Sequence, residues 1–196
     1  MEIQIIGASG FETAMYAMRL SFNSKRNDDS NIISDKGVSL HKDDITLAKR
    51  LLIKGDSHAK ATRMIQVWME IKAPRYWWAE FSTYKIGNTE MSESTVHTIL
   101  KRELQSSDFE GGMPDEILWY LNDHINNKDF MAIKSTLPES FLQTRVVNMN
   151  YQTLRHIYFD RRYHTLPEWG FFITKIKEEL PFSELITAEK ESKTSH

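Results

Sequence analysis

The chain has 196 residues, with 40% hydrophobic side chains, 27% charged side chains and a formal net charge of -2, a composition typical of one ordinary globular domain. It contains no cysteine, which excludes disulfides, thiolate nucleophiles and cysteine-ligated zinc or iron–sulfur sites. The charge argues against a protein that holds duplex nucleic acid through its phosphates, although a local basic patch would be compatible with it. No signal-peptide pattern or membrane-length apolar run is present, so we expect a cytoplasmic protein.

The first third of the chain predicts a strand and two helices. Glu2–Ala8 is a short β-like run rich in isoleucine. Ser9 and Glu12 have the spacing of a capping box, which predicts a helix directly after them. The apolar face of that helix would consist of Phe11, Ala14, Met15, Met18 and Phe22. The polar stretch Asn23–Gly37 is expected to be a loop. A second helix is predicted over Lys42–Lys54, because acidic residues begin it and basic residues end it.

The central stretch, Ile71–His97, is the part around which we expect the chain to be organised. Apolar and polar side chains alternate over Met64–Lys72, as in a half-buried strand. A helix is predicted over Pro74–Lys85, since proline suits the first turn of a helix. The small polar residues of Thr89–Thr95 then predict a loop.

The aromatic residues of this predicted helix have two interpretations. Trp77, Phe81 and Tyr84 follow the helical spacing i, i+4, i+7, which favours packing in a core. Tyr76 and Trp78 lie off that line and are better candidates for a pocket, where they could stack on a flavin or a base.

The last part of the chain predicts a mainly helical arrangement. Its expected elements are helices over Pro114–Ile125 and Asp129–Ile133, a strand over Thr144–Met149, and helices capped by Asn150 and by Thr165. In the helix after Asn150, Arg161 shares a face with Leu154 and Tyr158 and is therefore expected to point inward. Arg155 and Arg162 are expected to be solvated.

The order of these features resembles that of the flavin-dependent thymidylate synthases from about Ile3 to Ile186. Six segments carry the resemblance: Ala17-Met-Arg-Leu-Ser-Phe22, Ser57-His58, Glu70-Ile-Lys-Ala-Pro74, Leu137-Pro138, Thr144-Arg145, and Asn150-x-x-x-Leu154 followed by Arg161. The resemblance implies an α/β (α+β) fold, with a small, mainly antiparallel sheet flanked by helices in one domain over residues 1–186. Residues 187–196 would be a disordered polar tail. It also implies a homo-oligomer, a tetramer with sites between its subunits.

The same resemblance implies a set of site residues. Those at its cofactor-binding positions are His58, Tyr84, Lys85, Asn88, Glu90 and Asn150. Those at its substrate-binding positions are Glu80, Ser92, Ser94, Gln152 and Arg161. We expect the pocket between the helix Pro74–Lys85 with its following loop and the helix that begins at Asn150, where Lys85 would meet a phosphate. No catalytic residue is assigned, and no histidine spacing predicts a metal site.

The signature motif departs from the family pattern. The family's Arg-His-Arg reads Thr83-Tyr84-Lys85, its closing Arg-Tyr reads Ser94-Thr95, and the arginine that contacts the pyrimidine is Gln152. A neutral side chain cannot replace the bidentate, charge-assisted grip of arginine on a phosphate. Each such bond is worth roughly 1.5–3 kcal/mol, so the losses weigh against FAD, the cofactor that the resemblance implies, and against deoxyuridylate.

Two functions stay open. In the first, the chain binds a nucleotide-type small molecule without the standard reaction, as the arginine losses favour. In the second, it is an FAD-dependent enzyme that methylates deoxyuridylate, or makes a related one-carbon change, in pyrimidine nucleotide biosynthesis. That chemistry needs no cysteine nucleophile, so the absence of cysteine is compatible with it.

Overall fold

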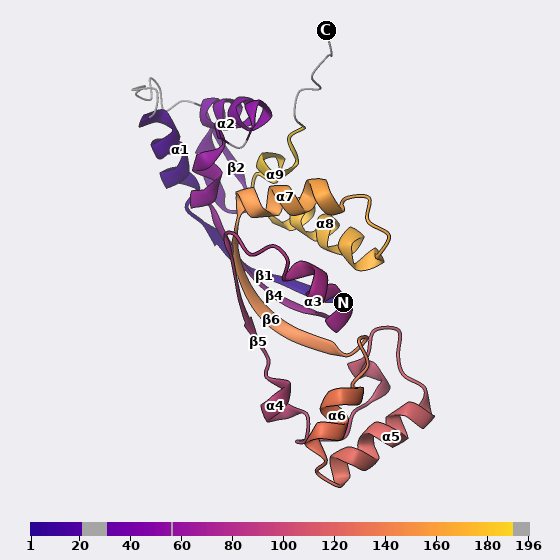
Figure 1. The fold of residues 1–196 in the computed structure, drawn as a ribbon. Helices are drawn as coiled ribbons and strands as arrows, with labels where there is room; N and C mark the ends of the chain where they lie inside the picture. The colour runs from indigo at the N-terminus through magenta and orange to yellow at the C-terminus, as the bar shows by residue number, and fades with distance from the viewer. Residues whose placement is uncertain (21–30, 56, 190–196) are drawn as a thin grey trace. The chain divides into compact units, whose positions relative to one another are not determined.

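A four-stranded, mainly antiparallel sheet is the central feature of the computed structural model, which describes residues 1–20, 31–55 and 57–189. In sheet order its strands are β1 (Glu2–Ser9), β4 (Gln66–Pro74), β6 (Leu142–Asn150) and β5 (Asn88–Ser92), drawn side by side in Figure 1. Helices flank the sheet, so the predicted α/β class with a small antiparallel sheet is confirmed.

The alternating pattern over the central strand is confirmed. Val67, Met69 and Ile71 are fully buried, whereas Trp68 and Glu70 between them are exposed. The strand begins two residues later than predicted, because Met64 ends a short 3-10 helix, η1 (Lys60–Met64).

The chain divides into two compact units. The first unit consists of Met1–Gln4, Glu70–Thr83 and Glu90–Val147. The second consists of Ile5–Met69, Tyr84–Thr89 and the described residues from Asn148 onward.

The described residues of the second unit form five α-helices. They are α1 (Phe11–Leu20), α2 (Lys42–Lys54), α7 (Tyr151–Arg161), α8 (Pro167–Glu179) and the unpredicted α9 (Glu184–Thr187). The apolar face predicted for α1 is buried at Phe11, Ala14, Met15 and Met18, while Phe22 lies outside the described residues. Between α1 and α2, an ion pair joins Arg19 to the fully buried Asp44. The apolar faces of both helices are buried.

The loop predicted over Asn23–Gly37 is wrong for its described part. Ile32–Asp35 forms β2, which pairs antiparallel with β3 (Val38–His41), with Ile32 opposite His41. The turn between them has positive φ at Lys36 (47°) and Gly37 (82°), as a two-residue hairpin turn requires. Residues 23–30 lie outside the described residues.

This hairpin holds the segment Leu180–Phe182, which follows α8. The ammonium of Lys36 donates to the first carbonyl of the segment (3.2 Å), and the buried hydroxyl of Tyr151 donates to the second. The backbone N–H of the last residue donates to a carboxylate oxygen of Asp35 (2.6 Å). Three consecutive residues are thus bonded to parts of the chain that are distant in sequence.

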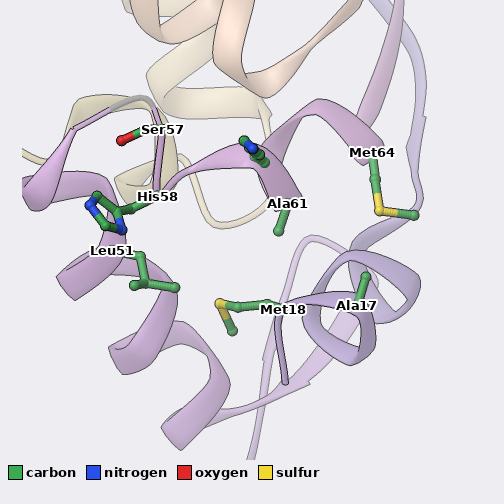
Figure 2. A pocket seen from close by; sticks show the side chains of 8 residues that line it. Ala17, Met18, Leu51, Ser57, His58, Ala61 and Met64 are labelled. Carbon is green, nitrogen blue, oxygen red and sulfur yellow. The ribbon is translucent and has the colours of Figure 1, made fainter. Parts of the chain in front are cut away.

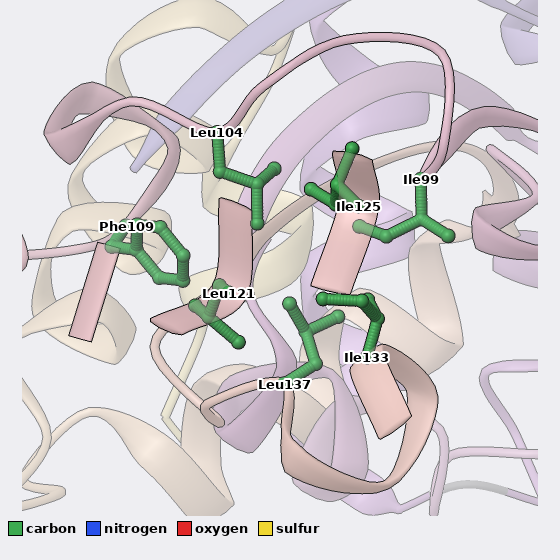
Figure 3. Packing of buried hydrophobic residues seen from close by; sticks show 7 residues of the cluster. All are labelled: Ile99, Leu104, Phe109, Leu121, Ile125, Ile133 and Leu137. Atoms are coloured by element: carbon green, nitrogen blue, oxygen red, sulfur yellow. The ribbon is translucent and has the colours of Figure 1, made fainter. Parts of the chain in front are cut away.

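The first unit contains a small helical core of its own. Its helices are α3 (Arg75–Phe81), α4 (Thr95–Thr98), α5 (Asp115–Asn126) and α6 (Phe130–Thr136), with a 3-10 turn, η2, at Ser106–Asp108. The predictions for α5 and α6 are confirmed within a few residues. Figure 3 shows the buried cluster, made of Ile99, Leu104, Phe109, Leu121, Ile125, Ile133 and Leu137.

The helix predicted over Pro74–Lys85 ends early, at Phe81. The hydroxyl and the N–H of Thr83 both donate to the carbonyl of Glu80 (2.7 and 3.1 Å), which closes a turn instead of another helical turn. The loop predicted over Thr89–Thr95 is also wrong, because Asn88–Ser92 forms β5.

The aromatic side chains of α3 are packed in the core. The rings of Trp77 and Phe81 stack with centroids 4.8 Å apart, as the core interpretation predicted. Trp78 is also buried, edge-on to Phe81 at 5.3 Å, and its indole N–H donates to the carbonyl of Gln143 (2.9 Å). Its assignment to a ligand pocket is therefore wrong.

Helix caps were predicted with mixed success. Asn150 caps α7 as expected, accepting the N–H of Thr153 (2.9 Å). At α8 the cap position is Leu166, without a side-chain cap bond, so the capping box predicted at Thr165 is wrong. Over the described ranges, no helix has the length and apolar character needed to cross a membrane.

Candidate functional site

His58 lies at a cavity of about 340 Å³ in the second unit. Gly55 ends α2, and its carbonyl accepts the N–H of His58 (3.0 Å), which turns the chain towards η1. The cavity is lined by Ala17, Met18, Leu51, Ser57, His58, Lys60, Ala61 and Met64 (Figure 2). Five of these side chains are apolar, while an imidazole, a hydroxyl and an ammonium supply polar groups. The lining can therefore contact apolar groups through its methionine, leucine and alanine side chains, and polar or anionic groups through Ser57, His58 and Lys60.

Tyr84 and Arg161, two residues implied by the resemblance, are bonded to each other in the second unit. The Nε of Arg161 donates to the Tyr84 hydroxyl (2.9 Å), which donates in turn to Asp160 (3.4 Å). The Arg161 guanidinium lies 4.8 Å from the ring centre of Trp169 and 5.7 Å from that of Tyr84. Arg161 points inward as predicted, and its partners here are side chains of this chain.

Burial raises the pKa of the Tyr84 hydroxyl above its usual range, although Arg161 acts in the opposite direction. Burial also raises the pKa of Tyr151, whose hydroxyl is bonded to the carbonyl of Pro181. Both tyrosines are therefore neutral in the folded chain at pH values where an unfolded tyrosine has begun to ionise.

We expect this pair of tyrosines to weaken the fold in alkali. A raised pKa gives stability that is fully present below the unfolded value of about 10 and is lost as the pH rises above it. Urea unfolding from about pH 9 to about pH 11 should show a smaller loss of stability for Tyr84→Phe and Tyr151→Phe than for the parent. The exposed Tyr16, changed to phenylalanine, serves as the control. The same loss of stability with pH in the parent and in all three variants would contradict the prediction.

The segment around Gly87 is fixed to the start of α7. The hydroxyl of Thr153 donates to the carbonyl of Ile86 (2.9 Å), and the N–H of Asn150 donates to the carbonyl of Gly87 (3.2 Å). Gly87 has a φ of 69°, and a side chain there would overlap Asn150. Asn88, half-buried, begins β5 directly afterwards.

Gln152, which the resemblance places at a pyrimidine-contacting position, is buried. Its side-chain oxygen accepts a hydrogen bond from Arg63, on η1. The residue thus has a partner within the second unit.

Glu90 belongs to a polar cluster of the first unit. Its carboxylate accepts hydrogen bonds from Arg145 (2.6 Å) and from the Ser82 hydroxyl (3.1 Å). The Arg145 guanidinium also donates to Gln143 (2.9 Å) and lies 4.4 Å from the ring centre of Trp78. Sequence reasoning did not assign Arg145 to the site, although its place in the Thr144-Arg145 motif could have indicated it.

The remaining predicted residues are exposed or half-buried. Lys85 is exposed and has no ion-pair partner in the described parts of the chain. Ser92 is exposed, and Ser94 precedes α4, where its carbonyl accepts the Thr98 hydroxyl (2.9 Å). Glu80, half-buried on α3, accepts through its carbonyl from Thr83.

Two arginines differ from their predicted solvation. Arg155 is only 1% exposed; it donates to the carbonyl of Ile186 (3.0 Å) and lies over the ring of Phe159 (4.6 Å). Arg162 is half-buried and paired with Glu189. Arg155 thus contacts α9, and Arg162 contacts the residues that follow it. The sequence predicted neither contact.

The structure thus groups the predicted residues in two sets. Glu80, Glu90, Ser92 and Ser94 belong to the first unit, and His58, Tyr84, Lys85, Asn88, Asn150, Gln152 and Arg161 belong to the second. A direct hydrogen bond joins Tyr84 to Arg161, while His58 lines the cavity. Among residues 1–20, 31–55 and 57–189, no group of three or more histidine or acidic side chains is arranged to hold a metal ion.

Comparison with known proteins identifies the fold. Two solved structures of thymidylate synthase X from Helicobacter pylori, both with FAD and dUMP, match with a TM-score of 0.75 each. They are 16% and 17% identical to this chain, and each match covers 96% of this chain and 98% of the other. No protein-family model matches the sequence, and no curated protein does. The resemblance found in the sequence motifs is thereby confirmed for the fold.

Proposed function

We propose that this chain, which has the fold of thymidylate synthase X, binds a nucleotide-type ligand and does not carry out the flavin-dependent reaction. The observation that supports binding is the cavity beside His58. Its apolar side chains suit a base-sized ring, and Lys60 and Ser57 can bind an attached anion or hydroxyl. His58 can stack on the ring or donate to it.

The loss of the flavin reaction is supported by the groups at the Arg-His-Arg positions. The Thr83 hydroxyl donates within its own turn, and the Tyr84 hydroxyl is engaged by Arg161. Lys85 is then the one cation of these three positions. A flavin pyrophosphate carries two negative charges close together, so these residues do not fit it as an arginine pair would.

The remaining predicted site residues are proposed as ligand contacts of their own unit, separate from the cavity beside His58. Lys85 is exposed and available to an anion, and Ser92 and Ser94 offer hydroxyls. The other six residues would act mainly by shaping the segments that carry Lys85, Ser92 and Ser94. They are Glu80, Asn88, Glu90, Asn150, Gln152 and Arg161. A homo-oligomer, a tetramer by resemblance, remains part of the proposal.

The second candidate function is FAD-dependent methylation of deoxyuridylate or a related one-carbon change. It is favoured by the shared fold with structures that contain FAD and dUMP. Purified protein that carries the visible absorbance of a flavin, or that FAD stabilises against heat, would support this candidate over the first.

A thermal-shift screen of nucleotides, deoxynucleotides and flavins tests the proposal. A ligand that binds only the folded chain stabilises it by about 2.7 kcal/mol at a hundred times its Kd. We expect at least one nucleotide to raise the melting temperature of the parent, and His58→Ala and Lys60→Ala to remove most of that shift. Both side chains are exposed, so the unliganded variants should melt near the parent.

Matched controls come from the first unit. His97→Ala and Lys101→Ala change exposed residues of the same kinds and should leave the shift intact. A nucleotide shift that survives His58→Ala would place the site elsewhere. The absence of any nucleotide shift would refute binding.

A further inference from the structure

The outer face of α5 exposes large aromatic side chains. Trp119 is 71% exposed and Tyr120 is 42% exposed, while Leu121 and Ile125 on the opposite face are buried in the helical core. Exposed tryptophan and tyrosine are the residues that dominate binding energy at protein interfaces. They are flanked on the same face by Glu116.

The charges of this face are all negative. Glu116 and Asp123 lie seven residues apart, on either side of Trp119 and Tyr120, at the spacing i, i+3, i+4, i+7. Asp115 adds a third exposed carboxylate. None of the three pairs with a cation in the described ranges. A partner should therefore offer cations beside a surface on which an indole can lie.

The outer face of α2 has the complementary pattern. Lys42, Thr46 and Lys49 are exposed at the spacing i, i+4, i+7, with Arg50 and Lys54 alongside, and the exposed carboxylate of Asp43 lies in the first turn beside Lys42. Within the part of the chain that the structure describes, none of these cations has a carboxylate partner. The inner face of the helix is buried through Ile45, Ala48, Leu51 and Leu52.

The two faces match in spacing as well as in charge. Seven residues of helix rise about 10.5 Å, so the Cα atoms of the two acidic residues of α5 and those of the two lysines of α2 are equally far apart along their helices. Between each pair lies an uncharged centre, Trp119 on one helix and Thr46 on the other. We propose that α5 of one copy of the chain docks on α2 of a second copy.

Three interactions would hold this contact. Glu116 and Asp123 would pair with Lys42 and Lys49, in either helix direction. The indole of Trp119 would lie on Thr46 and on the aliphatic stem of a lysine, with Arg50 placed for a cation–π contact. Because the two surfaces differ, the contact is head-to-tail and can add further copies. Its charge pairs are at the surface, so salt should weaken it.

Sedimentation of the full chain at increasing protein concentration tests the proposal. It is run at about 0.1 M and about 1 M salt, between which the Debye length falls from ~10 to ~3 Å. We expect the average mass to rise with concentration at low salt and to fall back at high salt. The average mass at high salt is the baseline. Any salt-resistant oligomer formed through other surfaces is already included in it, so only the salt-sensitive increase is counted.

Charge reversal then identifies the surfaces. The variant Glu116→Lys/Asp123→Lys and the variant Lys42→Glu/Lys49→Glu should each lose the salt-sensitive association. An equimolar mixture should regain it, because each variant then meets the opposite charge. Trp119→Ser should weaken association without changing its salt dependence, and the reversal of exposed Glu178 and Lys177 on α8 is the control.

Every changed side chain is exposed, so the variants should fold like the parent. Circular dichroism checks this. A parent that shows no salt-sensitive association would overturn the proposal. So would association that persists in the single variants, or a mixture that stays at the baseline mass. Loss of association only with the control reversal would assign the contact to α8 instead.

Discussion

Replacing Gly10 by alanine should lower the free energy of unfolding by about 2–5 kcal/mol, through two additive causes. Gly10 has a φ of 89°, a conformation that strains any residue with a Cβ atom. Its added methyl group would also overlap the carbonyl oxygen of Met64, which is backbone and has little freedom to move. That carbonyl lies at the junction of η1 and β4, so relief of the overlap would shift the central strand.

Gly37 separates the two causes. Its φ is 82°, but an added Cβ would meet no atom within 4 Å. Gly37→Ala should therefore cost only the backbone strain, about 1–2 kcal/mol. Chemical denaturation of the two variants and the parent provides the measurement. If both glycines give the same loss, the crowding at Met64 has no energetic effect.

Removing the Arg145 side chain should lower the free energy of unfolding by about 2–4 kcal/mol. The Glu90 carboxylate is only 18% exposed, and Arg145→Ala would leave it without the guanidinium, which is 19% exposed. The Trp78 ring and the Gln143 amide would lose contacts as well. A part-buried carboxylate without its cation costs much more than a lost surface ion pair.

The double variant distinguishes the charge from the packing. Glu90→Gln/Arg145→Met removes both charges, so it should be more stable than Arg145→Ala alone. The stability of Arg145→Lys should lie between those of the double variant and of Arg145→Ala. A single ammonium cannot contact Glu90 and Gln143 together as the planar guanidinium does. Unfolding in urea supplies the energies. Equal stability of Arg145→Ala and the parent would show that the pair contributes nothing.

The sequence predicted elements well where one physical signal was strong. The alternation over Val67–Ile71 identified β4, and the charge distribution along Lys42–Lys54 gave both ends of α2. The hairpin at Ile32–His41 was missed because Ile32 and Ile33 are both exposed, so no alternating pattern exists there. The end of α3 was missed because the bonds of Thr83 to Glu80 override a continuous aromatic spacing.

The sequence supplied candidate positions for the site, but it could not supply the contacts that these residues make. The motif order brought attention to Tyr84, Arg161 and His58, yet it could not indicate that Tyr84 and Arg161 bond to each other. Arg155 was expected to be solvated, and arginine is seldom fully buried unless it is paired. The structure buries it against a backbone carbonyl and an aromatic ring. Such partners become neighbours only through the tertiary fold.

The hydrogen bonds between the β2–β3 hairpin and the segment Leu180–Phe182 affect the order in which the chain can fold during synthesis. Asp35 and Lys36 are made early, but their partners follow about 145 residues later (|i−j| = 147 and 144). The second unit therefore cannot complete these hydrogen bonds until Phe182 has left the ribosome. The helical core of the first unit, from Ile99 to Leu137, is local and can form earlier. A ribosome that stalls before residue 180 would leave the hairpin without its partner.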